Sequence, residues 1–324
     1  MATYKGIQGY TVQKLSEDPT ASEVAGQLWY NSSSGKFRIS TEGAGSWAAG
    51  GDVNTPRQYG GGAGASNSSA IIFAGNPPAI TNTESYDGST WTEVNDMNSG
   101  SYYITGTGTQ TAALITGGNR VGGAGNYSAL NEIWDGTCWS EENNMVVGRN
   151  GPANIGTSTA ALATGGYNPP ITYTTHAESW NGTSWTEGNN LLYGAYGGAG
   201  AGTQTAALMF GGENPSQPAP QKNTQEWNGT SWTESGDMGN TRSWIQSAGT
   251  QTAALTSGGQ PSTVNTETYD GTSWTETSNL TTARSYNEGK LGSSASALVA
   301  TGTGTAATEE WSDPVYTIKT VTIS

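Results

Sequence analysis

Five glutamates recur at one position of a repeated pattern, and they are the first residues to consider for chemistry. Each begins an E-x-[YW] run, and they are Glu84, Glu132, Glu178, Glu267 and Glu309. A hydrolase needs a positioned pair of carboxylates or an activated nucleophile at one site. A carboxylate that recurs in nearly every repeat is typical of a structural role. We therefore expect these glutamates to bind a neighbouring backbone or a loop arginine.

The chain has one histidine and one cysteine, which leaves little capacity for metal or thiol chemistry. His176 lies near Glu178 in the sequence, with no second histidine and no nearby cysteine to complete a metal site. Cys138 stands in a turn where serine is usual, and we interpret it as a small, half-buried residue. The sequence therefore predicts no catalytic residue, no metal site and no cofactor. Turns rich in Asp and Asn leave open whether the protein binds a structural cation.

These residues belong to a repeat that is marked by a tryptophan. The steps between its copies are 44, 48, 46, 47 and 42 residues, and the copies are Trp47, Trp91, Trp139, Trp185, Trp232 and Trp274. Each unit also carries a Gly-Gly pair and a second aromatic residue. A period in the forties with these markers predicts four-stranded β-propeller blades rather than a helical solenoid.

Each unit divides into short strands. A small-residue strand such as T-A-A-L-I-T precedes Gly-Gly, the E-x-[YW] run is the next strand, and Asp-Gly or Asn-Gly makes a tight turn to the Trp strand. The loop into the next unit ends in an arginine at Arg57, Arg149, Arg242 and Arg284. Gly100 and Ala195 stand in the two remaining loops, so we expect those units to be held differently.

The order of these features, Gly-Gly, Tyr or Trp, Trp and then a loop with Pro or Arg, resembles the kelch repeat over residues 41–312. The resemblance implies an all-β fold, a six-bladed kelch-like propeller. The first Trp strand, residues 43–47, has no inner strands before it, and the last unit stops after Trp311 without a Trp strand. We therefore expect the N-terminal strand to complete the last blade and to close the ring.

The composition limits the classes of partner. The chain has 12 basic and 26 acidic residues, which give a formal charge of −14. This charge repels phosphate backbones and anionic lipids, so we expect no nucleic acid partner. The mean hydropathy is −0.52, and no apolar run approaches the roughly 18 residues of a membrane span. We expect a soluble protein without membrane insertion and, because the N-terminus lacks an apolar signal core, without secretion by that route.

Residues 1–40 lie outside the repeat. The run A-G-Q-L-W-Y-N-S-S-S-G-K-F-R-I-S predicts a β-hairpin over residues 27–40 with a Ser/Gly turn. This block, followed by G-S-W, resembles a short module of tailed-phage virion proteins, especially fibres and other appendages. The resemblance implies a chain made in the host cytoplasm and placed in the virion, with residues 1–40 as an anchor to other virion proteins. The alternative is an outer strand pair of the closing blade.

Residues 313–324 form an alternating, β-branched run after a proline, which predicts a strand. Within the chain this tail can join the closing blade or the N-terminal hairpin. Between chains it can pair with a neighbouring copy by strand addition. Homo-oligomerisation is therefore left open.

Three neighbouring loops between Gly-Gly and E-x-[YW] are longer than the others. The successive loop lengths are 8, 13, 11, 12, 7 and 6, and the long loops cover residues 119–131, 167–177 and 213–224. Such loops emerge on one face of a propeller, and their side chains suit contact with a sugar or a protein surface. The candidate binding residues are Arg120, Asn126, Tyr127, Tyr167, Tyr173, His176, Gln217 and Lys222. The alternative is that these loops are tolerated insertions in solvent.

Together these features predict a non-enzymatic structural protein of a phage particle. The first hypothesis is a tail fibre or receptor-binding appendage that binds a host surface glycan or protein, with avidity gained from many copies. The second is a capsid decoration or head-fibre protein whose propeller covers the shell. A glycan-active enzyme or a cellular kelch-type interaction module is the alternative from a different class.

Overall fold

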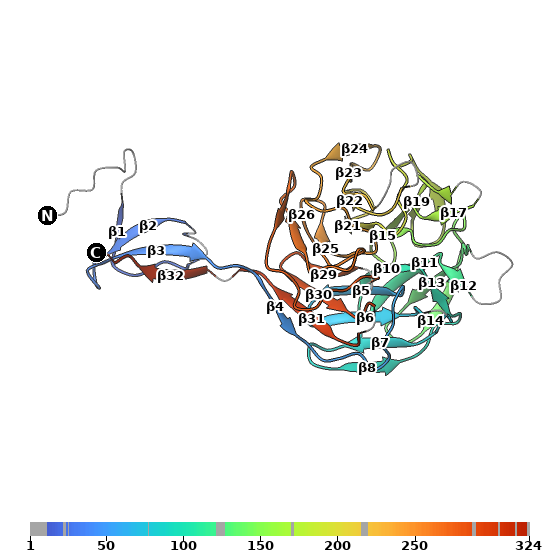
Figure 1. The fold of residues 1–324 in the computed structure, drawn as a ribbon, viewed down its shortest axis with the longest axis horizontal. Coiled ribbons are helices and arrows are strands. Elements are labelled where there is room, and N and C mark those ends of the chain that lie inside the picture. The colour runs from blue at the N-terminus through green and yellow to red at the C-terminus, as the bar shows by residue number, and fades with distance from the viewer. Residues whose placement is uncertain are drawn as a thin grey trace. The chain divides into compact units, whose positions relative to one another are not determined.

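The computed structural model describes residues 12–21, 24, 26–76, 78–120, 127–169, 172–214, 220–286, 290–303, 305–314 and 316–322. In these ranges the regular structure is β-strand, and no helix occurs (Figure 1). The chain divides into a smaller unit, Met1–Gly45 with Asp313–Ser324, and a larger unit, Ser46–Ser312. Each unit is described by itself.

The smaller unit is a four-stranded sheet in the order β1-β2-β3-β32. Its strands are β1 (Gln13–Leu15), β2 (Leu28–Asn31), β3 (Lys36–Glu42) and β32 (Tyr316–Thr320). Strands β2 and β3 form the expected antiparallel hairpin, with Tyr30 opposite Phe37. Strand β32 pairs with β3, so the C-terminal strand joins the N-terminal hairpin, which is one of the positions that the sequence left open.

The larger unit is built from antiparallel sets of four strands, in which neighbours along the chain pair in order, and three of the sets are joined into one larger sheet by short parallel pairs between their first strands. Figure 1 shows these sets around a common centre. The first set consists of β5 (Gly61–Ser66), β6 (Ser69–Phe73), β7 (Thr83–Tyr86) and β8 (Trp91–Val94), and the second of β10 (Thr105–Thr109), β11 (Ala112–Thr116), β13 (Asn131–Trp134) and β14 (Trp139–Glu142). The third set consists of β15 (Ala153–Gly156), β16 (Ala161–Thr164), β19 (Ala177–Trp180) and β20 (Trp185–Glu187), and the fourth of β21 (Ala199–Gly202), β22 (Ala207–Phe210), β23 (Thr224–Trp227) and β24 (Trp232–Ser235). The fifth set consists of β25 (Gln246–Thr250), β26 (Ala253–Ser257), β27 (Thr266–Tyr269) and β28 (Trp274–Glu276).

The last set combines both ends of the larger unit. Strands β29 (Lys290–Ser293), β30 (Ser296–Ala300) and β31 (Thr308–Ser312) pair in order, and β31 then pairs with β4 (Ser46–Ala49). In that pairing Trp311 lies opposite Trp47. Two short pairs lie in loops: β9 (Ser101–Tyr102) with β12 (Asn119–Arg120), and β17 (Tyr167–Asn168) with β18 (Thr172–Tyr173).

Small residues allow the first strands of these sets to approach one another. A Cβ atom on Gly106 of β10 would lie 2.6 Å from the carbonyl oxygen of Gly62 on β5. A Cβ atom on Gly200 of β21 would lie 2.4 Å from the side chain of Ile155 on β15. Larger residues at these positions would force the sheets apart, which explains the Gly- and Ala-rich inner strands.

A buried ion pair anchors the loop that enters a set to the third strand of the same set. Glutamates Glu267 and Glu309 lie 2.5 and 2.6 Å from the guanidinium groups of Arg242 and Arg284. The same contact joins Glu84 to Arg57 and Glu178 to Arg149, and the side chains of these four pairs are at most 3 % exposed. This confirms the expected contact between the repeated glutamates and the loop arginines.

Each of these glutamates also accepts hydrogen bonds from the backbone of the same loop. The distance is 2.7 Å from Asn54 N to Glu84 Oε2 and 2.7 Å from Thr281 N to Glu309 Oε2. The arginine in turn donates to carbonyl groups, for example from Arg284 Nη1 to Ala307 O at 2.8 Å. These bonds compensate the desolvation of both charges, which the ion pair alone would not do.

In the β10–β14 set another arginine replaces the missing one. Gly75 N donates to Ser101 O just as Gly212 N donates to Arg242 O, so Ser101, and not Gly100, occupies the arginine position. Arg120 approaches Glu132 instead, with 2.8 Å between Nη1 and Oε1. Arg120 is only 9 % exposed, so it belongs to this framework and not to an exposed binding surface, which corrects its expected role.

In the β21–β24 set the arginine and the glutamate are both absent. Ala195 occupies the arginine position and Gln225 the glutamate position, and both are buried. The Gln225 Oε1 atom accepts a hydrogen bond from Leu192 N at 2.7 Å. The neutral amide of Gln225 thus accepts the same backbone hydrogen bond as the glutamates of the other sets. No buried charge among the described residues of this set is left without a counterion.

We predict that Gln225→Glu destabilises the protein by about 3 kcal/mol, because it buries a carboxylate without its arginine. The double substitution Gln225→Glu with Ala195→Arg should recover much of this loss, since it recreates the pair of the other sets. Urea unfolding of the two variants and the parent measures both effects. Equal stability of the parent and the single variant would contradict the role that we assign to the pair.

The tight turns before the Trp strands hold their first side chain by hydrogen bonds. Asp87 Oδ1 accepts from Ser89 N at 2.8 Å and from Thr90 N at 2.9 Å. These bonds lower the pKa of Asp87 to about 2, and equivalent bonds lower the pKa of Asp135 and Asp270. Asn181 and Asn228 make the same bonds without a charge.

A pH dependence follows from these depressed pKa values. The stabilisation is present above the unfolded pKa of about 3.9 and is lost as the pH falls through the folded value. We expect the parent to lose stability between about pH 4 and pH 2 more steeply than the triple variant Asp87→Asn, Asp135→Asn and Asp270→Asn. Thermal unfolding across this range checks it, and parallel pH profiles would exclude a contribution from the turns.

Candidate functional site

Residues two places after the arginine position share one unusual backbone conformation. Their φ angles lie between 52° and 62°, and they are Tyr59, Tyr103, Gly151, Gly197, Trp244 and Tyr286. Positive φ is strained for a large residue and is held here by hydrogen bonds from one set to the next. Gly151 N donates to Tyr103 O at 2.7 Å, and Trp244 N donates to Gly197 O at 2.5 Å.

The four aromatic side chains at these positions meet. The centroid of the Tyr59 ring lies 4.4 Å from that of Tyr103, 4.2 Å from that of Tyr286 and 5.7 Å from that of Trp244. A Cβ atom on Gly197 would lie 2.5 Å from the Trp244 indole. Glycine at this position therefore makes room for the indole and tolerates the positive φ.

Tyrosines from neighbouring loops extend this cluster. Tyr196 lies 4.8 Å from Trp244 and 5.5 Å from both Tyr167 and Tyr173, measured between ring centroids. Tyr127 lies 5.5 Å from Tyr167. We call the resulting surface the aromatic face; it consists of Tyr59, Tyr102, Tyr103, Tyr127, Tyr167, Tyr173, Tyr196, Trp244 and Tyr286. All of these tyrosines are half-buried, so each ring keeps some exposure to solvent.

Three of the eight candidate binding residues, Tyr127, Tyr167 and Tyr173, come together on this face. His176 Nδ1 instead lies 3.9 Å from Glu187, and Lys222 Nζ lies 3.6 Å from Asp237. Arg120 is buried, as described above. Asn126 and Gln217 lie outside the described residues.

The centre of the aromatic face was not predicted from the sequence. Tyr59, Trp244 and Tyr286 each follow a loop arginine by two residues, in the runs R-Q-Y, R-S-W and R-S-Y. An aromatic residue at a fixed distance from the repeated arginine was the signal that could have revealed them. Tyr196 carries no such signal, because it follows the arginine position, here Ala195, by one residue and not by two.

The hydroxyl groups of Tyr59, Tyr103 and Tyr196 stay protonated at neutral pH. Burial is the main cause that raises the pKa of Tyr59, Tyr103 and Tyr196 above its ordinary value. A protonated phenol both donates and accepts hydrogen bonds, and its ring is apolar. The face can therefore stack on a flat apolar surface while it bonds to hydroxyl groups.

Exposed apolar side chains occur next to the aromatic face. Val146 is 58 % exposed, Leu192 is 47 % exposed and Tyr193 is 39 % exposed, and they lie in the loops that enter two neighbouring sets. The backbone of Tyr127 lies beside Gly148, and that of Tyr173 lies beside Gly194, in the same loops. Polar or small residues, Asn54, Asn98, Gly239 and Thr281, fill this loop position in four other sets.

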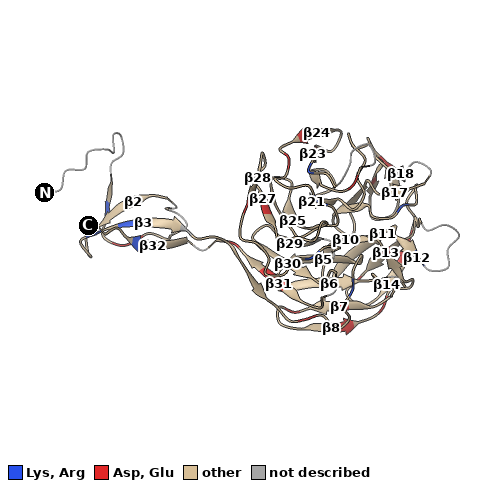
Figure 2. Cartoon of the chain, in the orientation of Figure 1, with Lys and Arg blue, Asp and Glu red and all other residues tan. Residues whose placement is uncertain are grey.

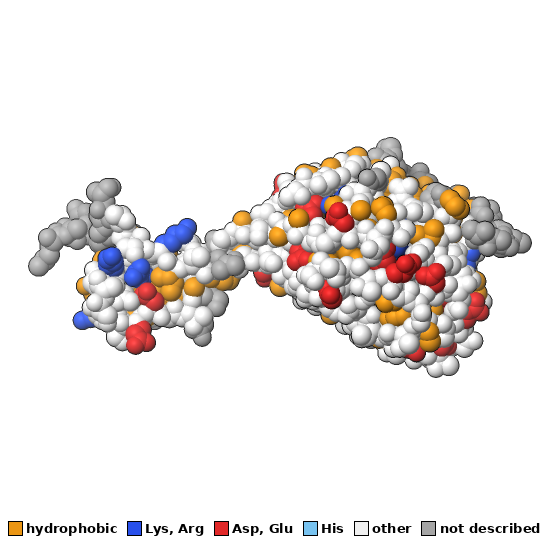
Figure 3. Space-filling view, turned by 90° about the horizontal axis from the view of Figure 1, so that it is seen from below, with side chains coloured by type: hydrophobic (Ala, Val, Ile, Leu, Met, Phe, Trp, Pro, Cys, Tyr) orange, Lys and Arg blue, Asp and Glu red, His pale blue; other side chains and the backbone are white. Residues whose placement is uncertain are grey.

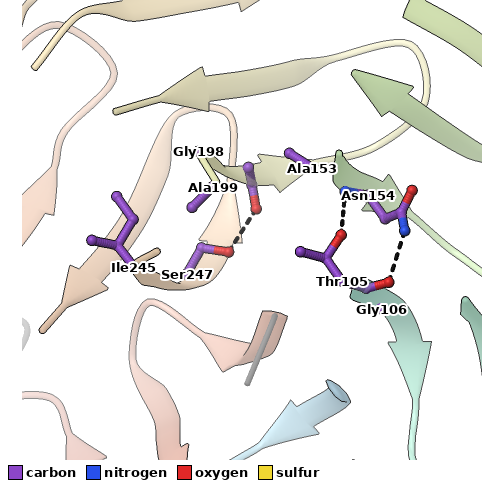
Figure 4. Close-up of a pocket in the computed structure, with 9 residues that line it drawn as sticks. Thr105, Gly106, Ala153, Asn154, Gly198, Ala199, Ile245 and Ser247 are labelled. Atoms are coloured by element: carbon purple, nitrogen blue, oxygen red, sulfur yellow. Dashed lines mark hydrogen bonds between the residues drawn. The ribbon is translucent and has the colours of Figure 1, made fainter. Parts of the chain in front are cut away.

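A small cavity lies at the centre of the larger unit. A cavity of about 20 Å³, enough for about one water molecule, lies among β10, β15, β21 and β25 (Figure 4). Its polar side chains already have partners: Asn154 Nδ2 donates to Thr105 O at 2.8 Å, and Ser247 Oγ donates to Gly200 O at 2.8 Å. The aromatic face is therefore the better candidate for binding.

The described ranges offer little for metal or thiol chemistry. There, no three His, Cys, Asp or Glu side chains lie close enough together to hold a metal ion. Cys138 is exposed rather than half-buried, and the charge of Asp135 raises the pKa of its thiol. In the same ranges no helix is long and apolar enough to cross a membrane.

Comparison with known proteins supports the fold. No protein-family model matches the sequence, and no curated protein sequence matches it. Among solved structures, that of YjhT is similar, with a TM-score of 0.62 and 14 % sequence identity over 84 % of this chain and 99 % of that one. With the all-β architecture, this likeness shows that the chain folds as a β-propeller.

We predict that Gly197→Ala destabilises the protein by about 2 kcal/mol, because the new methyl group meets the Trp244 ring and the backbone keeps a positive φ. Gly188→Ala is the matched control, since its Cβ would have only Ala177 O nearby, at 3.7 Å. Thermal unfolding and near-ultraviolet circular dichroism measure stability and ring packing. If the two variants behave alike, the aromatic residues do not depend on this glycine.

Proposed function

We propose that the chain is a six-bladed, kelch-like propeller closed by β4, and that it acts as a non-enzymatic, receptor-binding part of a phage particle. Six sets of four strands within the described ranges support the number of blades. The pairing of β31 with β4 supports closure, because it gives the last set its outer strand. A closed ring leaves no open sheet edge between the first and last blades.

Contacts between the last and first sets repeat those between other neighbours. Gly302 N donates to Arg57 O at 3.2 Å, as Gly259 N donates to Arg284 O at 2.9 Å. Trp91 Nε1 donates to Thr308 Oγ1 at 3.0 Å, as Trp139 Nε1 donates to Thr83 Oγ1 at 3.1 Å. The same interactions thus recur across the proposed closure.

The aromatic face is the observation that carries the binding function. Sugars present flat apolar faces edged by hydroxyl groups, and half-buried tyrosines offer ring faces together with hydroxyl groups. Tyrosine also provides contact area at a low cost in side-chain entropy. We therefore propose a host surface glycan as the first class of receptor, with a host surface protein as the second.

The smaller unit is the proposed anchor to other virion proteins. Its hairpin, β2 with β3, contains the sequence block that resembles tailed-phage virion modules. Many copies on one particle would raise the total avidity even when each aromatic face binds weakly. The repeated glutamates support a non-enzymatic role, because each is engaged by backbone amides and an arginine.

The proposal predicts that particles carrying Tyr167→Ala with Tyr173→Ala adsorb to host cells about tenfold more slowly. Two lost ring contacts of about 0.7 kcal/mol each amount to one factor of ten in affinity. The control is Tyr167→Phe with Tyr173→Phe, which keeps both rings and should adsorb nearly as the parent. Adsorption is measured as the loss of free infectious particles with time.

The position of the chain in a purified particle tests the same proposal. Immunogold labelling or a reconstruction from electron micrographs should place it at a tail appendage. Density on the capsid would favour a decoration role instead. Unchanged adsorption of the alanine variant, or absence of the chain from particles, would overturn the receptor-binding proposal.

A further inference from the structure

The two units differ strongly in charge. The smaller unit has five basic and five acidic residues, whereas the larger unit has seven basic and 21 acidic residues, a formal charge of −14. Basic residues lie on β3 and β32 of the smaller unit (Figure 2). Acidic side chains outnumber basic ones on the visible side of the larger unit (Figure 3).

The arginines of the larger unit do not offset this charge at its surface. All five are buried and engaged with glutamates: Arg57, Arg120, Arg149, Arg242 and Arg284. Lys222 is exposed and lies 3.6 Å from Asp237. The surface of this unit therefore attracts cations and repels anions over the distance that salt screening allows.

A carboxylate lies within the aromatic face itself. Glu213 is bridged to Tyr196 in an isolated antiparallel pair, which places the two side chains next to each other. Its Oε1 atom accepts a hydrogen bond from Ser243 Oγ at 3.1 Å. After burial, the charge of Glu213 is the next cause that raises the pKa of Tyr173, and it also raises the pKa of Tyr103 and Tyr196.

We propose that this part of the aromatic face, Tyr167, Tyr173 and Tyr196 with Glu213, binds a saccharide that carries a protonated amino group. The ammonium group donates hydrogen bonds to the Glu213 carboxylate, and it is attracted to the faces of the tyrosine rings. The sugar ring stacks on the remaining aromatic surface. This inference rests on the proposed glycan-binding function and narrows its ligand class.

Acidic saccharides are disfavoured by the same arrangement. A carboxylate or sulfate on the ligand would approach Glu213 and the negative surface of the larger unit without a free arginine to neutralise it. Like charges brought together at an interface suppress the wrong partner. The face should therefore discriminate by charge among sugars of similar shape.

The test measures calorimetric binding of the full-length protein to three hexasaccharides at physiological ionic strength and at a pH where the amine is protonated. The probes are the hexamers of glucosamine, N-acetylglucosamine and galacturonate. We expect the glucosamine hexamer to bind about tenfold more tightly than the N-acetylated one, and the galacturonate hexamer not to bind measurably.

Variants separate a specific site from general attraction to an acidic protein. Glu213→Gln should lose the tenfold preference and keep the weaker affinity for the N-acetylated hexamer. Glu141→Gln is the matched control, since it removes one charge from an exposed position on β14 and should bind as the parent. Equal losses in both variants would show non-specific attraction and overturn the inference.

The outcomes also distinguish this inference from the function on which it rests. If the two glucosamine-based hexamers bind equally and Tyr167→Ala with Tyr173→Ala abolishes both, the glycan-binding proposal stands and the amino-group inference falls. Tight binding of the galacturonate hexamer would likewise overturn the amino-group inference while leaving a glycan receptor in place. If none of the three hexamers binds, both the amino-group inference and the proposed glycan receptor are rejected.

Discussion

The buried pair between a loop arginine and a third-strand glutamate is the interaction on which the larger unit depends. In four of the sets it ties the loop that enters the set to that set, in the absence of helices among the described residues to cover the sheets. A buried pair is stabilising only when its remaining donors and acceptors are satisfied. Here the glutamate takes backbone amides and the arginine takes backbone carbonyls, so the pair organises a whole loop.

This anchoring also sets the geometry of the proposed binding surface. The loop is held at the arginine position, and the residue two places later has a strained, positive φ angle. The side chains of these residues turn toward one another. Tyr59, Trp244 and Tyr286 form the centre because their arginines hold the loops, whereas Gly151 and Gly197 leave room for neighbouring rings. Strain of this kind persists only where the surroundings determine it fully, and such places are often functional.

The same pairs determine the charge of the surface. Every arginine of the larger unit is used inside, so the acidic residues outside have few cations to balance them. In the β21–β24 set both members of the pair are replaced together: Gln225 stands in place of the glutamate and Ala195 in place of the arginine. Among the described residues, the buried glutamate thus occurs only where a buried arginine can pair with it. The buried ion pairs and the proposed ligand preference are therefore linked. Because the arginines are buried, the surface is acidic, and an acidic surface with an aromatic face favours a positively charged ligand.

The sequence by itself determined the repeat, its strands, the glutamate–arginine contact and the N-terminal hairpin, because short periods and turn residues encode local structure. It also named Tyr127, Tyr167 and Tyr173 as candidates, since long loops are visible in a sequence. It misjudged Arg120 and overlooked Tyr196. Only the tertiary structure decided the roles of these residues. Ring contacts join residues from different repeats, and Arg120 is buried because it pairs with Glu132, the glutamate whose loop has no arginine.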